Sequence, residues 1–371
     1  MARSDLVVVY SPVGGGHKAA ALAIAEAARA RGLSVTVIDT FEHAPGFVGD
    51  AYLAAHLAGQ NVAPELYGRM YFHANRRGDA LEPLRLEIDN LLFGGLADRV
   101  SDLHPRAVIA THHLPLVVLG RARRERSFFP PVVGVVTDYT AHACWAEGGV
   151  DAWAVPYGRA AAELREHLGD RSAVIARTGI PVRRAFERIR PVADPAPGER
   201  LRVLVTSGGF GVGPLERIVR SFAGIADVEL TIVCGASEKT KERIDEVVAQ
   251  CNLHANVLGF ERDMPTRMAA AHLVVGKAGG LTVTEALTAG RPMVIASAVP
   301  GNEKLNEALV TRARAGIASD PDSVGADVAR LRTTGALSLM GARARDLVPR
   351  HAADGVVNVA LALAAEARLA A

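Results

Sequence analysis

Short apolar runs recur along the chain, and most of them are continuous rather than alternating. They are rich in valine, isoleucine and alanine, and stretches with helical periodicity separate them. Continuous apolar strands with helices between them are typical of parallel sheets that helices cover on both faces. The sequence therefore predicts an α/β fold, with strands at residues 6–10, 35–39, 107–111, 132–138, 152–156 and 174–178, and again at 202–208, 229–235, 256–260, 272–276 and 292–297.

Residues 191–200, PVADPAPGER, break this alternation. The segment is rich in proline and polar residues and precedes a new strand, glycine loop and helix, as expected of a linker between domains. We predict an N-terminal domain over 1–190, a C-terminal domain over 201–350, and a last helix over 351–371 that packs back on the N-terminal domain. Both domains have a doubly wound, Rossmann-like pattern, and we expect them to face each other across a cleft that holds the ligands.

The charges of the chain nearly cancel. The formal net charge is +2 at pH 7, so no global field favours a nucleic-acid partner. The three cysteines, Cys144, Cys234 and Cys251, lie far apart without zinc-site spacing, as in proteins of a reducing cytoplasm. The N-terminus lacks a signal-peptide pattern, and no apolar run approaches the ~20 residues that span a bilayer. We expect a cytoplasmic protein that meets the inner face of the cell membrane, if at all, as a peripheral protein.

One region departs from the strand–helix alternation. Residues 41–95 hold many of the aromatic side chains, interleaved with arginines. One interpretation is an inserted helical pair with ordinary core aromatics. The other is an amphipathic surface that meets an anionic lipid interface or the acceptor. The residues concerned are Phe41, Phe47, Tyr52, Tyr67, Tyr71, Phe72 and Phe93, with Arg69, Arg76, Arg77 and Arg85.

A first glycine loop, VYSPVGGGHKA, follows the first predicted strand and leads into an alanine-rich helix. Its Gly14, Gly16 and Ala19 match the dinucleotide-binding spacing G-x-G-x-x-A, and Asp39 lies near the position where such a fold holds a ribose. One interpretation is therefore a nicotinamide-dependent oxidoreductase. The loop also carries His17, and histidine is the side chain best suited to proton transfer near neutral pH. A third interpretation is a tight turn with an incidental histidine.

A second glycine loop, TSGGFGVG at residues 206–213, stands at the same point of the second half, between a strand and a helix. A dehydrogenase combines one dinucleotide fold with a separate substrate domain. Two similar nucleotide-type halves suit two ligands that meet at the carboxyl ends of both sheets.

A third glycine-rich segment follows the strand HLVVG. Gly279 and Gly280 clear space at a helix start, where Leu281 and Thr282 can offer backbone N–H groups to a diphosphate that the helix dipole favours. Glu285, expected in the first turn of this helix, either grips two vicinal hydroxyls of a ribose or only complements the dipole.

The polar stretch PGNEKLN follows the last predicted strand of the second half. Its Asn302, Glu303 and Asn306 can read sugar hydroxyls through hydrogen bonds. The alternative is an ordinary polar loop with a helix N-cap.

Taken together, these stretches resemble a known family. The run GFERDM, GKAGGLTVTEALTAGRPMV and PGNEKLNEA is similar to the donor-binding signature of GT-B glycosyltransferases of the MurG and monogalactosyldiacylglycerol synthase group. SPVGGGHKAAA resembles the N-terminal motif of that group, and VTDYTAHACW and APELYGRMYF resemble motifs of its diacylglycerol glycosyltransferase branch. The resemblance covers nearly the whole chain in order.

The resemblance implies roles on both sides of the cleft. Residues 279–282 hold the diphosphate of a UDP-sugar with the loop at 207–209 nearby, and Glu285 holds the ribose. Glu303, with Asn302 and Asn306, holds the hexose, and the segment after NVLG borders the uracil. The implied donor-binding residues are Ser207, Gly208, Gly209, Phe260, Arg262, Met264, Gly279, Gly280, Leu281, Thr282, Glu285, Asn302, Glu303 and Asn306. The implied acceptor side comprises Gly15, Gly16, His113 and His142, together with His17.

Relatives of this type invert the anomeric centre, which requires an in-line attack and one general base. We expect His17 to be that base and Asp138, at a strand end on the same cleft, to be the second candidate, with His113 and His142 as further ones. A further hypothesis is a histidine–carboxylate relay, in which Asp138 orients the ring of His17.

The sequence suggests catalysis without a metal or other cofactor. No DxD-type motif lies at a plausible strand end, and Asp320-Pro-Asp322 matches by its letters only. We expect a hexosyltransferase that moves a hexose from a UDP-sugar to a hydroxyl of a lipid such as diacylglycerol. The alternatives are a polyprenyl-lipid or secondary-metabolite acceptor, and, in another class, the nicotinamide-dependent oxidoreductase. The identity of the sugar stays open.

Overall fold

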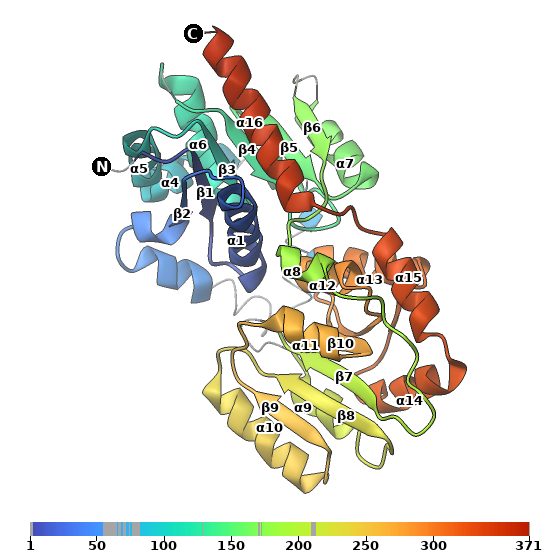
Figure 1. Cartoon of the computed structure of the whole chain (residues 1–371). Coiled ribbons are helices and arrows are strands. Elements are labelled where there is room, and N and C mark those ends of the chain that lie inside the picture. Colours follow the sequence, from blue (N-terminus) through green and yellow to red (C-terminus); the bar gives the residue numbers. More distant parts are fainter. Residues whose placement is uncertain are drawn as a thin grey trace. The chain divides into compact units, whose positions relative to one another are not determined.

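A computed structural model of the chain describes residues 3–54, 65, 68–69, 72–73, 75, 82–127, 129–169, 171, 173–208 and 213–370. The chain divides into two compact units (Figure 1). The first comprises Met1–Arg184 together with Pro349–Ala371, and the second comprises Ala185–Val348. The chain therefore passes twice between the units, at residues 184–185 and 348–349.

The first unit is built on a six-stranded parallel sheet with the order β2-β1-β3-β4-β5-β6. All the strands predicted in this half are present, and the sheet is parallel as expected, because the continuously apolar strands are buried on both faces. The strands are β1 (Leu6–Tyr10), β2 (Val35–Asp39), β3 (Ala107–Ala110), β4 (Val132–Val135), β5 (Ala152–Val155) and β6 (Val174–Arg177).

Helices cover both faces of this sheet. On one face, Val7 and Val9 pack in a core with Phe93, Leu114 and Trp153. This core is closed by α4 (Glu82–Phe93), α5 (Gly95–Leu103), α6 (His113–Glu125) and α7 (Gly158–Leu168). Two short 3-10 helices, η1 (Thr40–His43) and η2 (Ala143–Trp145), follow β2 and precede β5.

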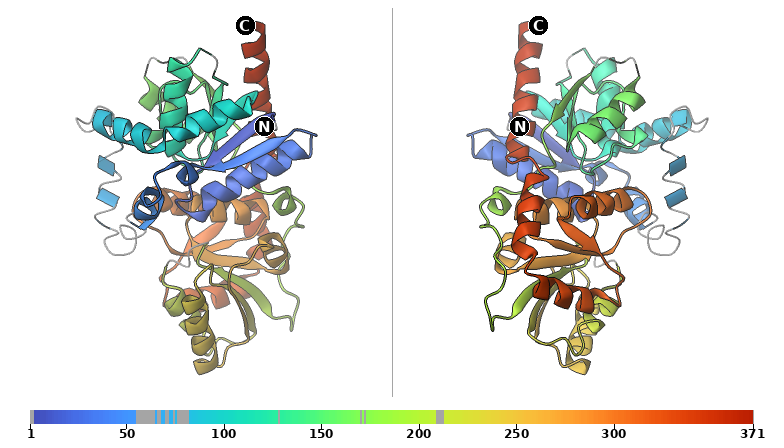
Figure 2. Two further views of the ribbon diagram at one scale, coloured as in Figure 1. Left: turned by 90° about the vertical axis from the view of Figure 1, so that its left-hand side faces the viewer. Right: turned by 90° about the vertical axis from the view of Figure 1, so that its right-hand side faces the viewer.

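The opposite face of the sheet is covered by α1 (Gly15–Arg29) and α16 (Ala352–Ala370). Leu6 and Val8 alternate with the residues of the other face, as side chains in a strand do, and pack with Ile24 and Val356. Figures 1 and 2 show the C-terminal helix, in red, beside the first unit. The last helix of the chain thus completes the core of the first unit.

The second unit holds another six-stranded parallel sheet, with the order β12-β11-β10-β7-β8-β9. Its strands are β7 (Leu201–Thr206), β8 (Val228–Val233), β9 (Ala255–Leu258), β10 (Leu273–Lys277), β11 (Met293–Ser297) and β12 (Gly316–Ala318). Its helices are α9 (Leu215–Arg220), α10 (Glu238–Gln250), α11 (Met264–Ala270), α12 (Gly280–Thr288), α13 (Asn302–Arg312), α14 (Val324–Thr334) and α15 (Leu337–Asp346). The short α8 (Arg184–Glu187) begins at the boundary of the two units.

Sequence patterning missed the edge strand β12. The strand has three residues, too few for an apolar run to be recognised. Gly316 allows its pairing with β11, because a Cβ atom there would lie 2.2 Å from the backbone oxygen of Met293.

Candidate active site

The first glycine loop joins β1 to α1 and leaves the start of the helix open. Gly14 precedes the helix with φ 89°, in the region that favours glycine, and it has no side chain to cap the first N–H groups. Gly15 and Gly16 form the first helical positions and are exposed and partly exposed, respectively. Free N–H groups and small residues at a helix start suit a polar ligand.

His17, in the first turn of α1, is held by two neighbouring strand ends. Its Nδ1 atom lies 2.8 Å from the backbone oxygen of Thr111 and 3.0 Å from Oγ1 of Thr137. Thr111 directly follows β3, Thr137 lies two residues after β4, and the order β1-β3-β4 brings these ends together. The hydroxyl of Thr111 also donates to the backbone oxygen of His17 over 2.9 Å, so the contact is reciprocal.

These contacts fix the tautomer of His17. A backbone carbonyl only accepts hydrogen bonds, so Nδ1 carries the proton and Nε2 keeps a lone pair. Burial lowers the pKa of His17 from 6.5 to about 4, although the hydrogen bond to Thr111 raises it. The ring is therefore neutral near pH 7, with Nε2 able to accept a proton.

Further histidines continue from His17. The His112 ring makes an edge contact with His17 at 4.5 Å between centroids, and His113 lies 4.2 Å from His112 and 6.3 Å from Trp145. His142 instead caps η2, since its Nδ1 accepts from the N–H of Cys144 over 3.2 Å. Of the two further histidine candidates, His113 belongs to this cluster, whereas His142 has a capping contact.

The partners of His17 differ from the predicted ones. Among the described residues, Nδ1 of the ring contacts Thr111 and Thr137, so these two residues hold this atom, whereas the sequence suggested Asp138. Asp138 is the residue after Thr137 and is half-buried. One feature of the sequence could have indicated that these threonines and His112 lie near the site. Each of them lies within two residues of the carboxyl end of a strand.

In the second unit, α12 begins at Gly280 with Gly279 as its N-cap, as the sequence predicts. Gly279 has no side chain that could cap the helix, and Leu281 and Thr282 are partly exposed. Its first N–H groups are therefore placed to bind an anion.

Glu285 is farther along α12 than expected. It is the sixth residue of the helix, beyond the first turn, and is partly exposed. The prediction of a first-turn position is wrong. Since the helix dipole acts mainly within the first turn, Glu285 gains little from complementing the dipole.

The second glycine loop begins at the end of β7. Ser207 is buried and donates to the backbone oxygen of Val233 over 3.3 Å, and Gly208 has φ 75°. Gly209 lies outside the described residues. A small recess near these residues is lined by Thr206, Ser207, Gly213, Pro214, Leu215, Ile218, Lys277 and Ser297.

The predicted polar loop after β11 is largely helical, because α13 begins at Asn302. Asn302 is partly exposed, whereas Asn306 is fully buried and donates to the backbone oxygen of Ala278 over 2.9 Å. Glu303 is also buried, accepts from the N–H of Val299 over 2.9 Å and pairs with Nζ of Lys277 over 2.8 Å. Asn306 and Glu303 thus connect α13 to the segment that starts α12, and sequence reasoning had not assigned Lys277 a role.

The residues assigned to the uracil follow β9. Phe260 is 62% exposed, Arg262 is exposed, and Met264 is the partly exposed first residue of α11. A large aromatic ring that is so exposed offers a surface for a stacked base.

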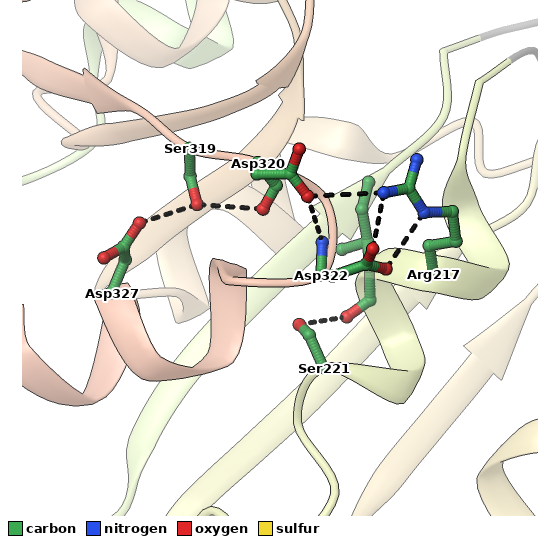
Figure 3. Close-up of polar contacts among 7 residues, drawn as sticks. Arg217, Ser221, Ser319, Asp320, Asp322 and Asp327 are labelled. Atoms are coloured by element: carbon green, nitrogen blue, oxygen red, sulfur yellow. Dashed lines mark hydrogen bonds and ion pairs between the residues drawn. The ribbon is translucent and has the colours of Figure 1, made fainter.

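The acidic pair near residue 320 has a different environment, shown in Figure 3. Arg217 of α9 donates to Asp322 over 2.9 Å and to Asp320 over 3.3 Å, and Ser319 donates to Asp327 over 2.7 Å. Both aspartates thus pair with an arginine. Over the described ranges, no group of three or more His, Cys, Asp or Glu side chains is arranged to hold a metal ion. Among the described helices, none combines the length and apolar character that crossing a membrane requires.

Comparisons with known proteins identify relatives of both halves of the chain. Residues 17–182 match the family model of monogalactosyldiacylglycerol (MGDG) synthase, and residues 202–318 match that of the glycosyltransferase family 28 C-terminal domain. The chain is 24% identical over 325 residues to a processive diacylglycerol beta-glucosyltransferase of Bacillus cereus (strain B4264), covering 86% of this chain and 82% of that protein.

Solved structures share the fold. MurG of Acinetobacter baumannii superposes with a TM-score of 0.61 at 18% identity, over 96% of this chain and 99% of that one. A MnaA–UDP co-structure from S. aureus also gives a TM-score of 0.61, at 14% identity over 96% and 95% of the two chains.

The two parallel sheets and the glycine-rich helix starts at their carboxyl ends define a GT-B glycosyltransferase. Within this class, residues 17–182 match the monogalactosyldiacylglycerol synthase model and residues 202–318 match the glycosyltransferase family 28 C-terminal domain, in that order along the chain. The resemblance, the fold class and the hexosyltransferase class predicted from the sequence are confirmed. The alternative of a nicotinamide-dependent oxidoreductase finds no support in these matches.

Proposed function

We propose that this enzyme transfers a hexose from a UDP-sugar to a hydroxyl of diacylglycerol, with inversion and with His17 as the general base. The observation that carries the proposal is the contact of His17 Nδ1 with the Thr111 carbonyl, which leaves Nε2 unprotonated. The names of the relatives support the acceptor, since they are processive diacylglycerol beta-glucosyltransferases. The MnaA–UDP co-structure, which has the same fold, supports a UDP-linked donor.

On the acceptor side, the hydroxyl donates its hydrogen bond to Nε2 of His17 and loses its proton as it attacks the anomeric carbon. Gly15 and Gly16 leave room for the acceptor at the start of α1. His112 contacts the ring of His17 and His113 contacts His112, so two further polar rings lie in sequence beside the base. Asp138, next to Thr137, remains the second candidate for the base.

On the donor side, the N–H groups at the start of α12 bind the diphosphate and stabilise the charge that develops as UDP departs. Glu285 binds the ribose hydroxyls, and Asn302, partly exposed at the start of α13, reads the hexose. Phe260 stacks on the uracil. In this proposal the chain supplies the electrostatic stabilisation itself, with no metal or other cofactor.

The direct test is a transfer assay with UDP-glucose and UDP-galactose in micelles that contain diacylglycerol, with product analysis by mass spectrometry and NMR. We expect a hexosyl-diacylglycerol with the anomeric configuration opposite to that of the donor. A polyprenyl phosphate or a soluble alcohol as the only acceptor used would contradict the choice of diacylglycerol. Retention of configuration would contradict the single-base mechanism.

A membrane-facing surface is part of the proposal. Leu84, Ile88 and Leu91 of α4 are 59%, 45% and 83% exposed, and their spacing places them on one face of the helix. Phe93 is buried, and Leu92 packs partly in the core, so α4 presents apolar side chains both inward and outward. This outward face supports peripheral attachment to the inner face of the cell membrane. Tyr67, Tyr71, Arg76 and Arg77, which the sequence linked to such a surface, lie outside the described residues.

The double variant Leu84→Asp/Leu91→Asp is expected to lower the binding to anionic phosphatidylglycerol-containing vesicles about tenfold or more, since burying one leucine contributes roughly 1.5–3 kcal/mol. Co-sedimentation measures the bound fraction, and UDP affinity is expected to stay unchanged. Leu339→Asp on α15, which replaces a leucine that is 54% exposed, is the matched control. Equal vesicle binding by all three proteins would rule out this face.

The pH profile of kcat/KM is expected to report His17. Because burial lowers the pKa of His17 to about 4, the base form persists as the pH falls below 6.5, and the acid limb lies nearer pH 4 than 6.5. The ring also stabilises the fold above the unfolded pKa of 6.5, and this contribution is lost as the pH falls towards 4. Circular dichroism at each pH separates unfolding from titration. A limb at 6.5 with the fold intact would contradict the assignment.

A further inference from the structure

Lys277 is the last residue of β10 and stands two residues before the N-cap of α12. The pairing of β10 with β11 shifts register between Gly276 and Lys277, an irregularity of the kind that redirects a side chain next to a functional site. Lys277 therefore lies where the sheet ends and next to the start of α12, which the proposed function assigns to the diphosphate.

The lysine stem lies against two glycines from different loops. A Cβ atom built on Gly208 would lie 3.7 Å from Cε of Lys277, and one built on Gly279 would lie 3.6 Å from the same atom. Lys277 also lines the recess that contains Ser207. The side chain thus bridges the loop after β7 and the start of α12.

Glu303 holds the ammonium group in this place. Its Oε1 accepts from Lys277 over 2.8 Å, and its Oε2 accepts from the N–H of Val299 over 2.9 Å. The carboxylate is 9% exposed, while the lysine side chain is 24% exposed. An ammonium group has three donors, and Glu303 takes one of them.

We propose that Lys277 binds the diphosphate of the donor and stabilises departing UDP, and that Glu303 is a positioning residue for this lysine rather than a reader of the hexose. The inference rests on the proposed function and adds a residue to its donor site. It also supplies a charge that the chemistry needs, since a helix start provides only about half an elementary charge and an ammonium provides a full one.

The bond changes of the step balance without a further reactant. The acceptor oxygen forms a bond to the anomeric carbon, and its proton passes to Nε2 of His17. The bond between the anomeric carbon and the β-phosphate oxygen breaks, and its electron pair stays on that oxygen. Lys277 keeps its proton throughout and donates hydrogen bonds to the phosphate oxygens.

The first test measures UDP and uridine affinity by calorimetry in wild type, in Glu303→Gln, and in Lys277→Met/Glu303→Gln. The double variant avoids an unpaired buried carboxylate, which would destabilise the fold. Relative to Glu303→Gln, it is expected to bind UDP about 10- to 100-fold more weakly and uridine equally well, since charge-assisted hydrogen bonds to phosphate are lost. Lys304→Met, which removes an exposed lysine of α13, is the matched control and should bind UDP as the wild type does.

Equal UDP affinity in Glu303→Gln and the double variant would overturn the role of Lys277. This outcome is distinct from failure of the proposed function, in which the wild type itself binds no UDP.

The second test separates positioning by Glu303 from recognition of the hexose. Glu303→Gln removes a negative charge beside the diphosphate, so UDP affinity is expected to rise severalfold, since Lys277 still reaches the bound diphosphate. The kcat is expected to fall about tenfold, because the ammonium is no longer held where charge develops on the departing oxygen. If Glu303 instead bound the hexose, Glu303→Gln would bind UDP with unchanged affinity and would bind only the UDP-sugar more weakly. That result would overturn the positioning role.

Discussion

Replacing His17 with alanine is expected to lower kcat for transfer about 10²- to 10⁴-fold, the range that a general base contributes. The reason is the geometry of the ring: Thr111 and Thr137 hold Nδ1, so Nε2 is the atom that can accept the acceptor proton. UDP affinity is expected to be unchanged, because His17 lies in the first unit and the α12 helix start lies in the second. Calorimetry with UDP and a transfer assay measure the two quantities separately.

His254→Ala, which removes an exposed histidine, is the control for His17→Ala and should retain full kcat. The variant Asp138→Asn distinguishes the two candidates for the base. If His17→Ala turned over normally and Asp138→Asn did not, the base would be Asp138, and the neutral state of His17 would have another purpose.

Replacing Glu285 with alanine is expected to weaken UDP binding about 100-fold, the loss for a carboxylate that accepts two hydroxyl hydrogen bonds. Its place as the sixth residue of α12 supports this role, because a residue beyond the first turn gains little from the helix dipole. Calorimetry with UDP and with 2′-deoxy-UDP tests the contact directly. The wild type should prefer UDP, and the variant should bind both nucleotides equally.

Glu307→Ala, on the neighbouring helix α13, is the control for Glu285→Ala and should keep the preference for UDP. A Glu285→Ala protein that still prefers UDP over its 2′-deoxy form would show that another group reads the ribose. A loss of affinity for both nucleotides with the preference intact would point to a structural role for Glu285.

The strands and most loop positions follow from the order of residues alone. Continuous apolar runs such as LVVVY and LVVG, rich in β-branched residues and separated by helical patterns, are typical of strands in a sheet covered on both faces, so the parallel α/β architecture is encoded locally. Gly14 and Gly279 likewise mark their helix starts, because the chain turns tightly there. The short β12 and the helical start of the PGNEKLN segment carried too little local signal.

The sequence by itself thus determined the class of fold and the glycine-rich helix starts, and it predicted His17 as a candidate base. Only the tertiary structure decided what surrounds these residues. Thr111 lies 94 positions from His17, Thr137 lies 120 from it, and Glu303 lies 26 from Lys277. Such partners depend on which strands are neighbours in the sheet, and a hydrophobic pattern specifies that a strand is buried but not which strand lies beside it.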